Sequence, residues 1–410
     1  MTKQRTFLVT GGLGFIGSNF VRYKLKNSND KIVILDALTY AGNLDNLKEF
    51  INDNTVMLPT SQKRLDLIEE SVNWREGKIE KSILNKDTRI ENLKFKTADY
   101  KINTFNTEEL NSQIKSLMSD EKLLVVIGSI EDSSVVEQIM SEVDFVVNYA
   151  AETHVDRSIL NPDAFIKTDI YGTYVLLEAL KKSDNVSKFL HISTDEVYGA
   201  APFGVSYKET DTIDPQNPYS ASKAGADRMV NAYNNTYQLP VMIARPSNNF
   251  GPHQYPEKLI PLMIMKALRD EQLPIYGDGK QIRDWLFVED TAFAVDKIIE
   301  KGTAGEVYNI SGRNERENID IVTMLLDGLN KPSSLIKYIK DRPGHDRRYS
   351  INDSKLQELL KDEDTSAHWQ PLEELIKITI DWYINNKPWW DKILHSDKEY
   401  QDFINKWYNR

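Results

Sequence analysis

Short apolar runs alternate with longer amphipathic segments over the first 246 residues of the chain. The apolar runs are rich in Val, Ile, Leu and Phe, which is typical of strands buried on both faces. The predicted strands are Thr6–Thr10, Lys31–Leu35, Leu123–Ile127, Asp144–Tyr149, Lys188–Ile192 and Val241–Ala244. The segments between them include predicted helices over Ser18–Lys26, Ala164–Lys181 and Ala221–Tyr237. This alternation of strand and helix predicts an α/β fold with a doubly wound parallel sheet.

The pattern changes after Pro246, where short segments are punctuated by proline and glycine. Such punctuation favours a smaller lobe that closes over the ends of the strands. We therefore expect a dinucleotide-binding domain over residues 1–246. Residues 247–410 should mainly form a substrate-binding lobe, with some segments returning to the large domain.

A polar segment over about residues 53–121 interrupts the alternation. Within it, Leu65–Leu84 has apolar residues at helical spacing, although Gly77 lies inside the run. We interpret the segment as a solvated surface insertion that the fold does not need. A lid over the site or an oligomer contact is the alternative interpretation.

Composition excludes several classes of protein. The 410 residues are 40% hydrophobic, which is enough for a sizeable core, and the net charge of −11 argues against nucleic acid as a partner. Cysteine is absent, so disulfides and cysteine–zinc sites are excluded, and the six histidines show no metal-ligand spacing. No signal peptide or membrane span is predicted. We expect a soluble, cytoplasmic protein that binds no membrane, nucleic acid or metal.

The glycines Gly11, Gly14 and Gly17 lie between the first strand and the first helix. This G-x-x-G-x-x-G spacing permits a tight turn and a close approach of the backbone to a pyrophosphate. The helix N-terminus offers free N–H groups to the phosphates. Asp36 ends the next strand, where its carboxylate can bond ribose hydroxyls and would repel a 2′-phosphate. The pattern predicts a Rossmann-type NAD site rather than an NADP site.

Two further motifs carry candidate chemistry. Tyr219 and Lys223 are four residues apart, so they share one face of a helix, and the ammonium should lower the pKa of the phenol. The tyrosine could then take a proton from a sugar hydroxyl while hydride leaves for NAD. Asp195 and Glu196 follow a buried strand, in which neighbouring side chains would point to opposite faces. Both acids can reach one site only if the chain turns out of the strand at Thr194.

Taken together, these stretches resemble the extended short-chain dehydrogenase/reductase family, and within it the dTDP-glucose 4,6-dehydratases. The resemblance covers about Thr6–Asn52 and Leu123–Trp390. T-D-E-V-Y-G is its most specific motif, because related epimerases and decarboxylases usually lack the acid pair. Other matching stretches are T-G-G-L-G-F-I-G-S-N-F, N-Y-A-A-E-T-H-V-D-R-S-I, N-P-Y-S-A-S-K-A, P-S-N-N-F-G-P, L-P-I-Y-G-D-G-K-Q-I-R-D-W-L-F-V-E-D and R-P-G-H-D-R-R-Y.

The resemblance implies a lyase reaction in three steps. Tyr219 assists oxidation at C4 of the sugar by NAD⁺, with Thr194 bonding the C4 oxygen. Glu196 then removes the C5 proton as a general base, while Asp195 protonates the departing C6 hydroxyl. Hydride finally returns to C6. One of the two acids should be neutral and the other ionised at rest, which their mutual repulsion promotes.

The resemblance also implies binding residues. Those for the cofactor are Gly11, Gly14, Phe15, Ile16, Gly17, Asp36, Leu38, Thr39, Ser129, Ile130, Ala150, Ala151, Thr153, Thr168, Tyr219, Lys223 and Asn249. Those for the nucleotide sugar are Thr153, Thr194, Asn248, Lys258, Leu259, Pro274, Ile275, Tyr276, Arg283, Asn318 and His345. Lys258 and Arg283 would supply positive charge for a diphosphate. Ser129 departs from the family, which has an aspartate that bonds the adenine amine, so we expect weaker adenine binding.

The expected partners are a nucleotide sugar, with dTDP-glucose favoured, and a second copy of the chain in a homodimer. Pro274 and Tyr276 imply thymine, although uracil differs only by a methyl group. One alternative is a UDP-sugar 4-epimerase or decarboxylase of the same family, against which the acid pair argues. Another is a non-catalytic dinucleotide-binding protein, against which Thr194, Tyr219 and Lys223 argue.

Overall fold

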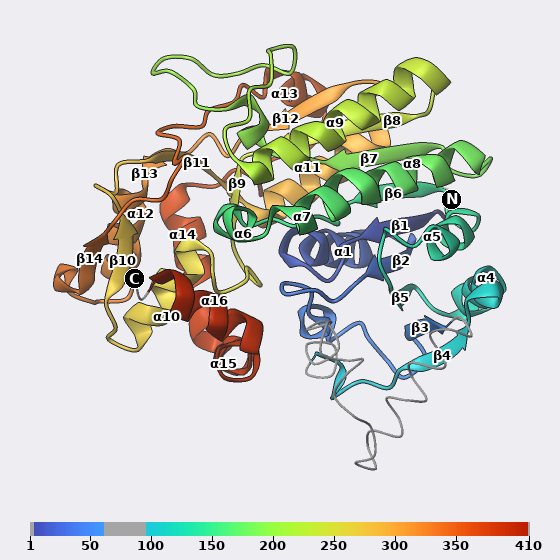
Figure 1. Cartoon of the computed structure of the whole chain (residues 1–410), viewed down its shortest axis with the longest axis horizontal. Helices are drawn as coiled ribbons and strands as arrows, with labels where there is room; N and C mark the ends of the chain where they lie inside the picture. Colours follow the sequence, from blue (N-terminus) through green and yellow to red (C-terminus); the bar gives the residue numbers. More distant parts are fainter. Residues whose placement is uncertain (1–3, 61–95, 409–410) are drawn as a thin grey trace.

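A parallel sheet of nine strands forms the centre of the computed structural model, which describes residues 4–60 and 96–408 (Figure 1). The strand order is β12-β8-β7-β6-β1-β2-β5-β3-β4, and every neighbouring pair is parallel. The strands are β1 (Thr6–Thr10), β2 (Lys31–Asp36), β3 (Val56–Thr60), β4 (Asn103–Asn106), β5 (Leu123–Ile127), β6 (Phe145–Asn148), β7 (Lys188–Ile192), β8 (Val241–Pro246) and β12 (Val307–Ile310).

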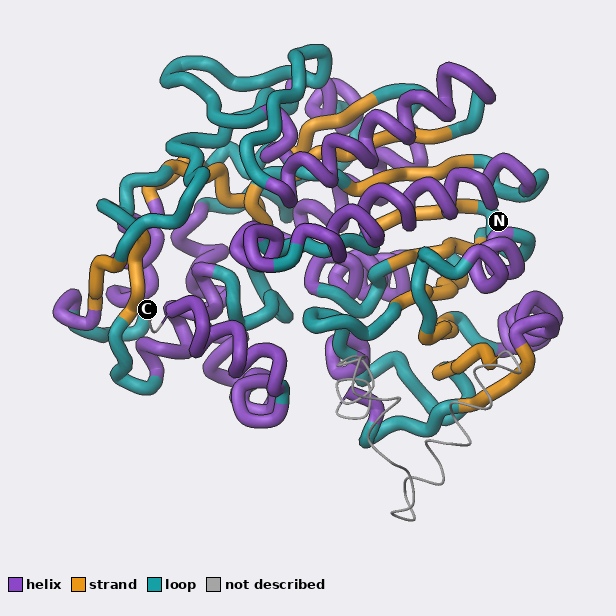
Figure 2. Tube along the Cα trace, viewed as in Figure 1, coloured by secondary structure: helices purple, strands orange, loops and turns teal. Residues whose placement is uncertain are grey.

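Helices cover both faces of this sheet (Figure 2), as the alternation of strand and helix predicts. One face carries α1 (Phe15–Asn27), α11 (Val288–Lys301) and α13 (Ser354–Leu360). The other face carries α4 (Leu110–Asp120), α5 (Ser133–Met140), α8 (Thr173–Lys182) and α9 (Pro218–Tyr237). Alternate residues of the central strands enter the two cores: Phe7 and Val9 face α1, and Leu8 faces α8. The doubly wound sheet is confirmed.

Short helical elements connect these layers. Before α8 the chain forms α6, α7 and a single stretch of π-helix, and 3-10 turns interrupt three other connections. Their bounds are η1 (Leu44–Leu47), η4 (Thr107–Glu109), α6 (Val155–Leu160), α7 (Pro162–Phe165), η5 (Ile166–Gly172) and η6 (Asp195–Tyr198).

The prediction of a surface insertion over residues 53–121 is wrong, because both described ends of this segment belong to the sheet. β3 pairs with β5, and β4 pairs with β3 at the sheet edge. Val56 and Met57 are fully buried, and so are Leu110 and Ile114 on α4. Polar residues on the outer face of an edge strand and its covering helix gave this segment its solvated composition. The helical spacing over 65–84 lies outside the described residues.

A smaller lobe lies beside the carboxyl ends of the strands. It contains a three-stranded sheet in the order β13-β11-β9, a two-stranded parallel sheet of β10 and β14, and a separate apolar core. Its elements are β9 (Asn248–Phe250), α10 (Leu259–Leu268), β10 (Leu273–Tyr276), β11 (Ile282–Phe287), β13 (Glu315–Glu317), α12 (Asn318–Gly328), η7 (Ser333–Leu335), β14 (Ile336–Ile339), α14 (Leu372–Asn385), α15 (Lys387–Ser396) and α16 (Lys398–Tyr408). Over residues 4–60 and 96–408, no helix is both long and apolar enough to cross a membrane.

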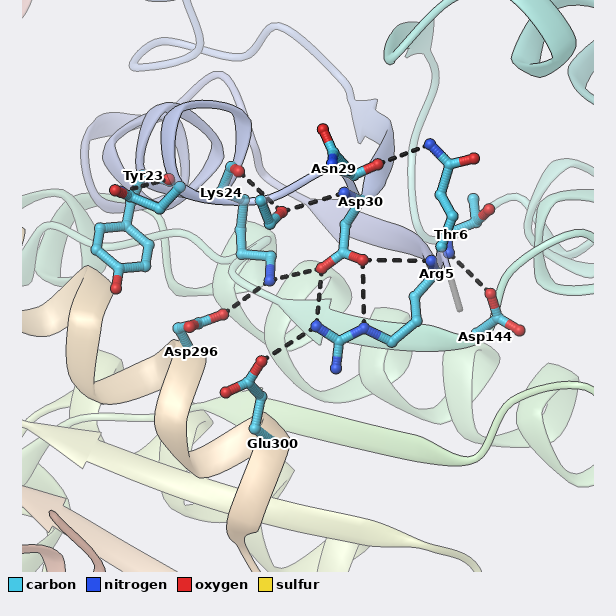
Figure 3. A network of polar contacts seen from close by, with 12 residues as sticks. Arg5, Thr6, Tyr23, Lys24, Asn29, Asp30, Asp144, Asp296 and Glu300 are labelled. Atoms are coloured by element: carbon cyan, nitrogen blue, oxygen red, sulfur yellow. Dashed lines mark hydrogen bonds and ion pairs between the residues drawn. The ribbon is translucent and has the colours of Figure 1, made fainter. Parts of the chain in front are cut away.

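A buried cluster of charges lies at the amino ends of β1 and β2, on the side of the sheet away from the cleft (Figure 3). The Lys24 ammonium is 2.8 Å from a carboxylate oxygen of Asp30 and 2.9 Å from one of Asp296. Arg5 donates to both carboxylate oxygens of Asp30 and to Glu300. Lys24 also lies 4.6 Å from the centre of the Phe7 ring. Each charge in this cluster has a partner of opposite sign.

Candidate active site

The glycine turn between β1 and α1 forms one wall of a deep cleft at the carboxyl ends of the strands. Gly11 has φ +64°, and a Cβ there would lie 2.7 Å from the backbone nitrogen of Ala150. A Cβ on Gly17 would lie 2.3 Å from the carbonyl oxygen of Gly11. These positions therefore require glycine. The first turn of α1 begins after Gly14 and contains no acidic residue, so its N–H groups face the cleft without a local negative charge.

Asp36 lies at the end of β2 in the wall of the same cleft. Its two carboxylate oxygens accept hydrogen bonds from the backbone N–H groups of Leu13 (2.9 Å) and Leu38 (2.8 Å). Burial nevertheless raises the pKa of Asp36. Each oxygen keeps a lone pair that can accept a ribose hydroxyl, so the carboxylate fits the role that its position predicts.

Lys96 clamps the loop that follows Asp36. Its buried ammonium donates to the carbonyl oxygens of Thr39 and, at 2.9 Å, Tyr40. Burial lowers the pKa of Lys96 to about 8. The sequence gave no signal for this contact, because Lys96 lies in the segment that we expected to be a solvated insertion.

Three polar residues, two from the loop after β5 and one from η5, meet farther along the cleft. Ser129 follows β5 and lines the cleft together with Glu131 and Thr168. The Ser129 hydroxyl accepts a hydrogen bond from the Glu131 backbone N–H (3.1 Å), and Thr168 donates to the Glu131 carboxylate (3.0 Å). Glu131 thus places a carboxylate in the cleft two residues after the serine that replaces the family's aspartate. The sequence analysis missed it.

The acid pair lies on a 3-10 turn rather than on a strand. β7 ends at Ile192, Thr194 remains extended, and η6 begins at Asp195. The Thr194 hydroxyl accepts a hydrogen bond from the Glu196 backbone N–H (3.2 Å), which caps the turn, and it donates to Asp195 (3.1 Å). Because the chain leaves the strand here, Thr194, Asp195 and Glu196 all line the cleft. The predicted turn at Thr194 is confirmed.

The Asp195 carboxyl is buried and only half satisfied. Its side chain is 2% exposed, and its Oδ2 atom has no hydrogen-bond partner among the described residues. Burial, followed by the negative charge of Glu196, raises the pKa of Asp195 well above its ordinary value. Both effects favour the protonated form of this carboxyl, which lines the cleft.

Tyr219 and Lys223 share one face of α9, whose N-terminus is held by a capping box between Asn217 and Ser220. Both side chains line the cleft, and the Lys223 ammonium donates to the Ile192 carbonyl at 2.8 Å. The prediction that the Tyr219 pKa is lowered is wrong. Burial, followed by the charges of Glu196 and Asp169, raises this pKa well above its ordinary value. The lysine is hydrogen-bonded to the strand, and the carboxylates outweigh its influence.

The cleft unites most of the predicted site residues. Those that line it are Gly11, Gly14, Phe15, Ile16, Gly17, Asp36, Thr39, Ser129, Ile130, Ala150, Ala151, Thr153, Thr168, Thr194, Asp195, Glu196, Tyr219, Lys223, Asn248, Asn249 and Lys258. The predicted residues outside its lining are Leu38, Leu259, Pro274, Ile275, Tyr276, Arg283, Asn318 and His345. Apart from Leu38, which lies in the loop that follows Asp36, this second group belongs to the smaller lobe.

Cationic side chains link the cleft to this second group. Lys258 donates to the Thr153 carbonyl (2.8 Å) in the cleft wall. Arg342 donates to Asp156 (3.0 Å), which also accepts from the Tyr276 hydroxyl (3.0 Å). The positive charge of this region acts on Glu196, because Arg342 and Lys258 both interact with its carboxylate.

Tyr349 connects the same region to the acid pair. Its hydroxyl lies 3.4 Å from the Glu196 carboxylate and donates to Asp346 at 2.6 Å. The Arg283 guanidinium covers its ring at 4.2 Å. We did not identify Tyr349 or Arg342 from the sequence, although both lie in R-P-G-H-D-R-R-Y, from which only His345 was chosen.

The fold and the cleft together define a dinucleotide-binding α/β protein with two adjacent carboxyl side chains and a tyrosine in one site. The family described as GDP-mannose 4,6 dehydratase matches residues 81–374, and the NAD dependent epimerase/dehydratase family matches residues 7–103. A dTDP-glucose 4,6-dehydratase of Xanthomonas campestris pv. campestris (strain B100) is 39% identical over 95% of this chain and 96% of that protein.

Solved structures agree with these matches. A dTDP-glucose 4,6-dehydratase from Streptomyces venezuelae, solved with NAD and TYD bound, has a TM-score of 0.73 and 33% identity, covering 94% of this chain and 99% of that one. The dTDP-glucose 4,6-dehydratase of Bacillus anthracis, solved with NAD, has a TM-score of 0.70 and 36% identity over the same shares. The chain belongs to the nucleotide-sugar 4,6-dehydratases of the NAD dependent epimerase/dehydratase family.

Proposed function

We propose that this chain is an NAD-dependent dTDP-glucose 4,6-dehydratase, a lyase that forms dTDP-4-keto-6-deoxyglucose. The observation that carries the proposal is the shared cleft of Asp195, Glu196 and Tyr219 beside a glycine turn. Elimination needs an acid and a base at adjacent carbons, and a 3-10 turn presents two adjacent carboxyls to one space.

The cleft suits NAD at both of its ends. The Gly11–Gly17 turn and the first turn of α1 would hold the pyrophosphate, and Asp36 would hold the adenosine ribose. Glu131 adds a carboxylate beside Ser129 that can accept the adenine amine in place of the family's aspartate. When bound, NAD⁺ accepts hydride from C4 of the sugar and gives it back at C6.

In this proposal Tyr219 and Thr194 both hydrogen-bond the C4 oxygen. The positive charge of bound NAD⁺ would favour the Tyr219 phenolate that accepts the C4 hydroxyl proton. Both side chains line the same cleft, and the Thr194 hydroxyl acts on the Tyr219 phenol. Asp169 lies behind them, fully buried, accepting from Ser222 and from the Glu152 backbone N–H (2.8 Å). This carboxyl holds the start of α9 against the loop after β6.

Asp195 and Glu196 then divide the elimination. Burial raises the pKa of Asp195, which favours the protonated carboxyl that would protonate the departing C6 hydroxyl. Glu196 is partly exposed to the cleft and interacts with the positive charges of Arg342 and Lys258, and we assign it the role of base at C5. The two roles follow from the two environments of neighbouring residues.

Positive charge supports a diphosphate in an otherwise acidic protein. Arg283 is buried, and Lys258 and Arg342 are half-buried; all three interact with the charge of Glu196. The buried Oδ1 atoms of Asn248 and Asn318 have no protein partner within the described residues, so each can accept an N–H or O–H group of the substrate. The relatives' names support thymine and glucose, and Pro274 and Tyr276 would pack against the base.

The rival proposal of a 4-epimerase or decarboxylase needs no protonated acid next to the C4 site. The Oδ2 atom of the buried Asp195 carboxyl has no hydrogen-bond partner among the described residues, which is costly for the fold, and an elimination gives the proton of this carboxyl a use. A purely dinucleotide-binding protein would need neither Asp195 nor Tyr219 in the cleft. The geometry therefore supports the dehydratase best.

We also propose a cytoplasmic homodimer. An exposed apolar surface runs along α6, η5 and α8, with Ile166 55% exposed and Tyr171 51% exposed. Its other members are Leu160, Tyr174 and, on α9, Tyr237. Contiguous exposed aromatic and aliphatic side chains of this kind mark protein interfaces, and a second copy would cover them with the same surface.

Parallel assays with four sugar nucleotides test the proposed function. The purified protein is offered dTDP-, UDP-, GDP- and CDP-glucose, and the 4-keto product is quantified. We expect the highest kcat/KM with dTDP-glucose and a product that has lost water. A 4-epimer as the main product would replace the dehydratase proposal, and preference for another base would correct the substrate alone.

A further inference from the structure

Tyr198 ends the 3-10 turn that carries the two acids, and its hydroxyl is fixed from two sides. The Tyr198 hydroxyl accepts a hydrogen bond from the Arg245 guanidinium (2.7 Å) and donates one to Asn309 Oδ1 (2.9 Å). The guanidinium also lies 4.8 Å from the centre of the Tyr198 ring. η6 is only four residues long, so a contact at Tyr198 acts directly on Asp195 and Glu196.

The same arginine reaches the helix that carries Tyr219 and Lys223. Arg245 Nε donates to Asp227 Oδ2 at 2.9 Å, and Asp227 lies on α9 one turn after Lys223. Asp227 also lies 3.8 Å from the buried His191, and it acts on the Lys223 ammonium. Arg245 itself belongs to β8, the strand between β7 and β12.

All members of this contact chain are buried. Asp227 and Asn309 are fully inaccessible, Tyr198 is 1% exposed, and Arg245 is 2% exposed. Charge-assisted hydrogen bonds of this kind are strong away from water and fix planar groups in one geometry. The guanidinium plane therefore sets the distance between η6 and α9.

We propose that Arg245 is a positioning residue for the dehydratase reaction, acting through Tyr198 on the acid pair and through Asp227 on the tyrosine helix. The inference rests on the proposed function, because it assigns elimination to η6 and oxidation to α9. The two steps act on neighbouring carbons of one bound sugar. The sugar can serve both steps in one pose only if η6 and α9 are held in a fixed relation.

The inference explains why an arginine, rather than an apolar residue, is buried in β8. A buried cation is a poor stabiliser compared with a well-packed apolar side chain. A guanidinium can, however, connect two elements with parallel donors, which lysine cannot do. Misplacement of a catalytic group by about 1 Å can reduce a rate by about 10²-fold, so such a connection has a catalytic value.

The test removes only the Tyr198 hydroxyl. Tyr198→Phe keeps the ring and loses the link to Arg245, while Tyr207→Phe is the matched control. The Tyr207 ring stacks on Tyr198 at 5.4 Å, but its hydroxyl donates to the exposed Ala200 carbonyl (3.2 Å) and not to Arg245. Single-turnover mixing with dTDP-glucose measures the formation of reduced cofactor and the loss of water as separate rates. The dissociation constant of dTDP and the melting temperature are measured for each variant as well.

We expect Tyr198→Phe to slow water loss about 10-fold or more, within the range that misplacement produces, while oxidation changes by less than about 2-fold. The dissociation constant of dTDP should be unchanged. Tyr207→Phe should leave both steps as they are. A purely structural role would lower the melting temperature and leave the ratio of the two rates unchanged. Equal slowing of both steps, or of neither, would overturn the inference.

A second variant guards against misfolding of the first. Arg245→Lys keeps the ion pair with Asp227 but cannot also reach Tyr198, so it should show the same selective loss of elimination. If both variants keep the ratio of elimination to oxidation, the positioning role is wrong. If the unmodified protein oxidises dTDP-glucose without losing water, the proposed function fails and the positioning inference falls with it. The two failures are thus distinguishable.

Discussion

Two buried groups of charges lie at opposite ends of the same sheet and follow opposite rules. At the amino ends, Lys24 lies between Asp30 and Asp296 at 2.8 and 2.9 Å. At the carboxyl ends, Asp195 and Glu196 are adjacent acids, and Asp195 Oδ2 has no hydrogen-bond partner among the described residues. Charges of opposite sign are paired in the first group, whereas the second group places two acidic side chains next to each other.

The pKa values of the acids express this difference. Burial opposes ionisation of Asp30, but hydrogen bonds from Arg5 and Lys24 outweigh it and hold its pKa below the ordinary value. Burial and Glu196 instead raise the pKa of Asp195. The paired charges at the amino ends stabilise the fold. The acid pair at the carboxyl ends instead has a raised pKa at Asp195, as is common at catalytic sites.

Asp195→Asn should produce the largest effect. The variant keeps the shape of the side chain but has no acidic proton, so water loss should slow about 10² to 10⁴-fold. Oxidation at C4 should survive, because it depends on Tyr219 and Lys223. Stopped-flow absorbance should show reduced cofactor that rises and stays. Dehydration at the normal rate would remove the acid role from Asp195.

Glu196→Gln should separate the two acids from each other. Without its base the variant should stop after oxidation, and exchange of the C5 hydrogen with solvent deuterium should fall by about 10² to 10⁴-fold. Asp195→Asn should retain this exchange. Proton NMR of the recovered sugar nucleotide in deuterium oxide measures both variants. Identical exchange in the two would contradict the division of roles.

Lys24→Met should break the paired cluster without touching the cleft. Asp296 would then lose its closest cation, while Asp30 would keep Arg5, so we expect a loss of about 3 kcal/mol of unfolding free energy, the lower end of the cost of breaking a buried pair. Urea unfolding measures the loss, and turnover per folded molecule should stay constant. Lys182→Met is the control, because the exposed Lys182–Glu137 pair should add nothing measurable. A loss no larger than the control's would show that pairing is unimportant here.

The smallest effect should be a gain of stability in Asp195→Asn. The folded protein binds the Asp195 proton more tightly than the unfolded chain does, so wild-type stability falls as pH rises above the ordinary pKa of 3.8. The asparagine lacks this dependence. We expect the variant to be more stable by about 1 kcal/mol at pH 7 and equal to wild type near pH 3. A variant that is less stable at pH 7 would contradict the raised pKa of Asp195.

Strong local patterns allowed much of the fold to be predicted. The predicted bounds of β1, β5 and β7 match the structure, because each is a short apolar run with clear ends. The turn at Thr194 could be predicted because two adjacent acids cannot share one face of a strand. The glycine spacing likewise located the dinucleotide cleft.

The misses depend on contacts between distant segments. β3, β4 and α4 resemble a solvated insertion because only their inner positions, such as Met57 and Ile114, meet the core. The contact of Lys96 with the loop that follows Asp36 joins residues more than fifty positions apart. The pKa of Tyr219 depends on Asp169 and Glu196, which only the folded chain brings near it. Spacing along a sequence carries no such information.

Migration of an isotope tests the central claim most directly. The protein is given dTDP-glucose labelled with deuterium at C4, and the product is analysed by NMR and mass spectrometry. The account predicts a 4-keto-6-deoxy sugar with the deuterium at C6 and solvent hydrogen at C5. Deuterium returned to C4, with the C6 hydroxyl retained, would contradict it.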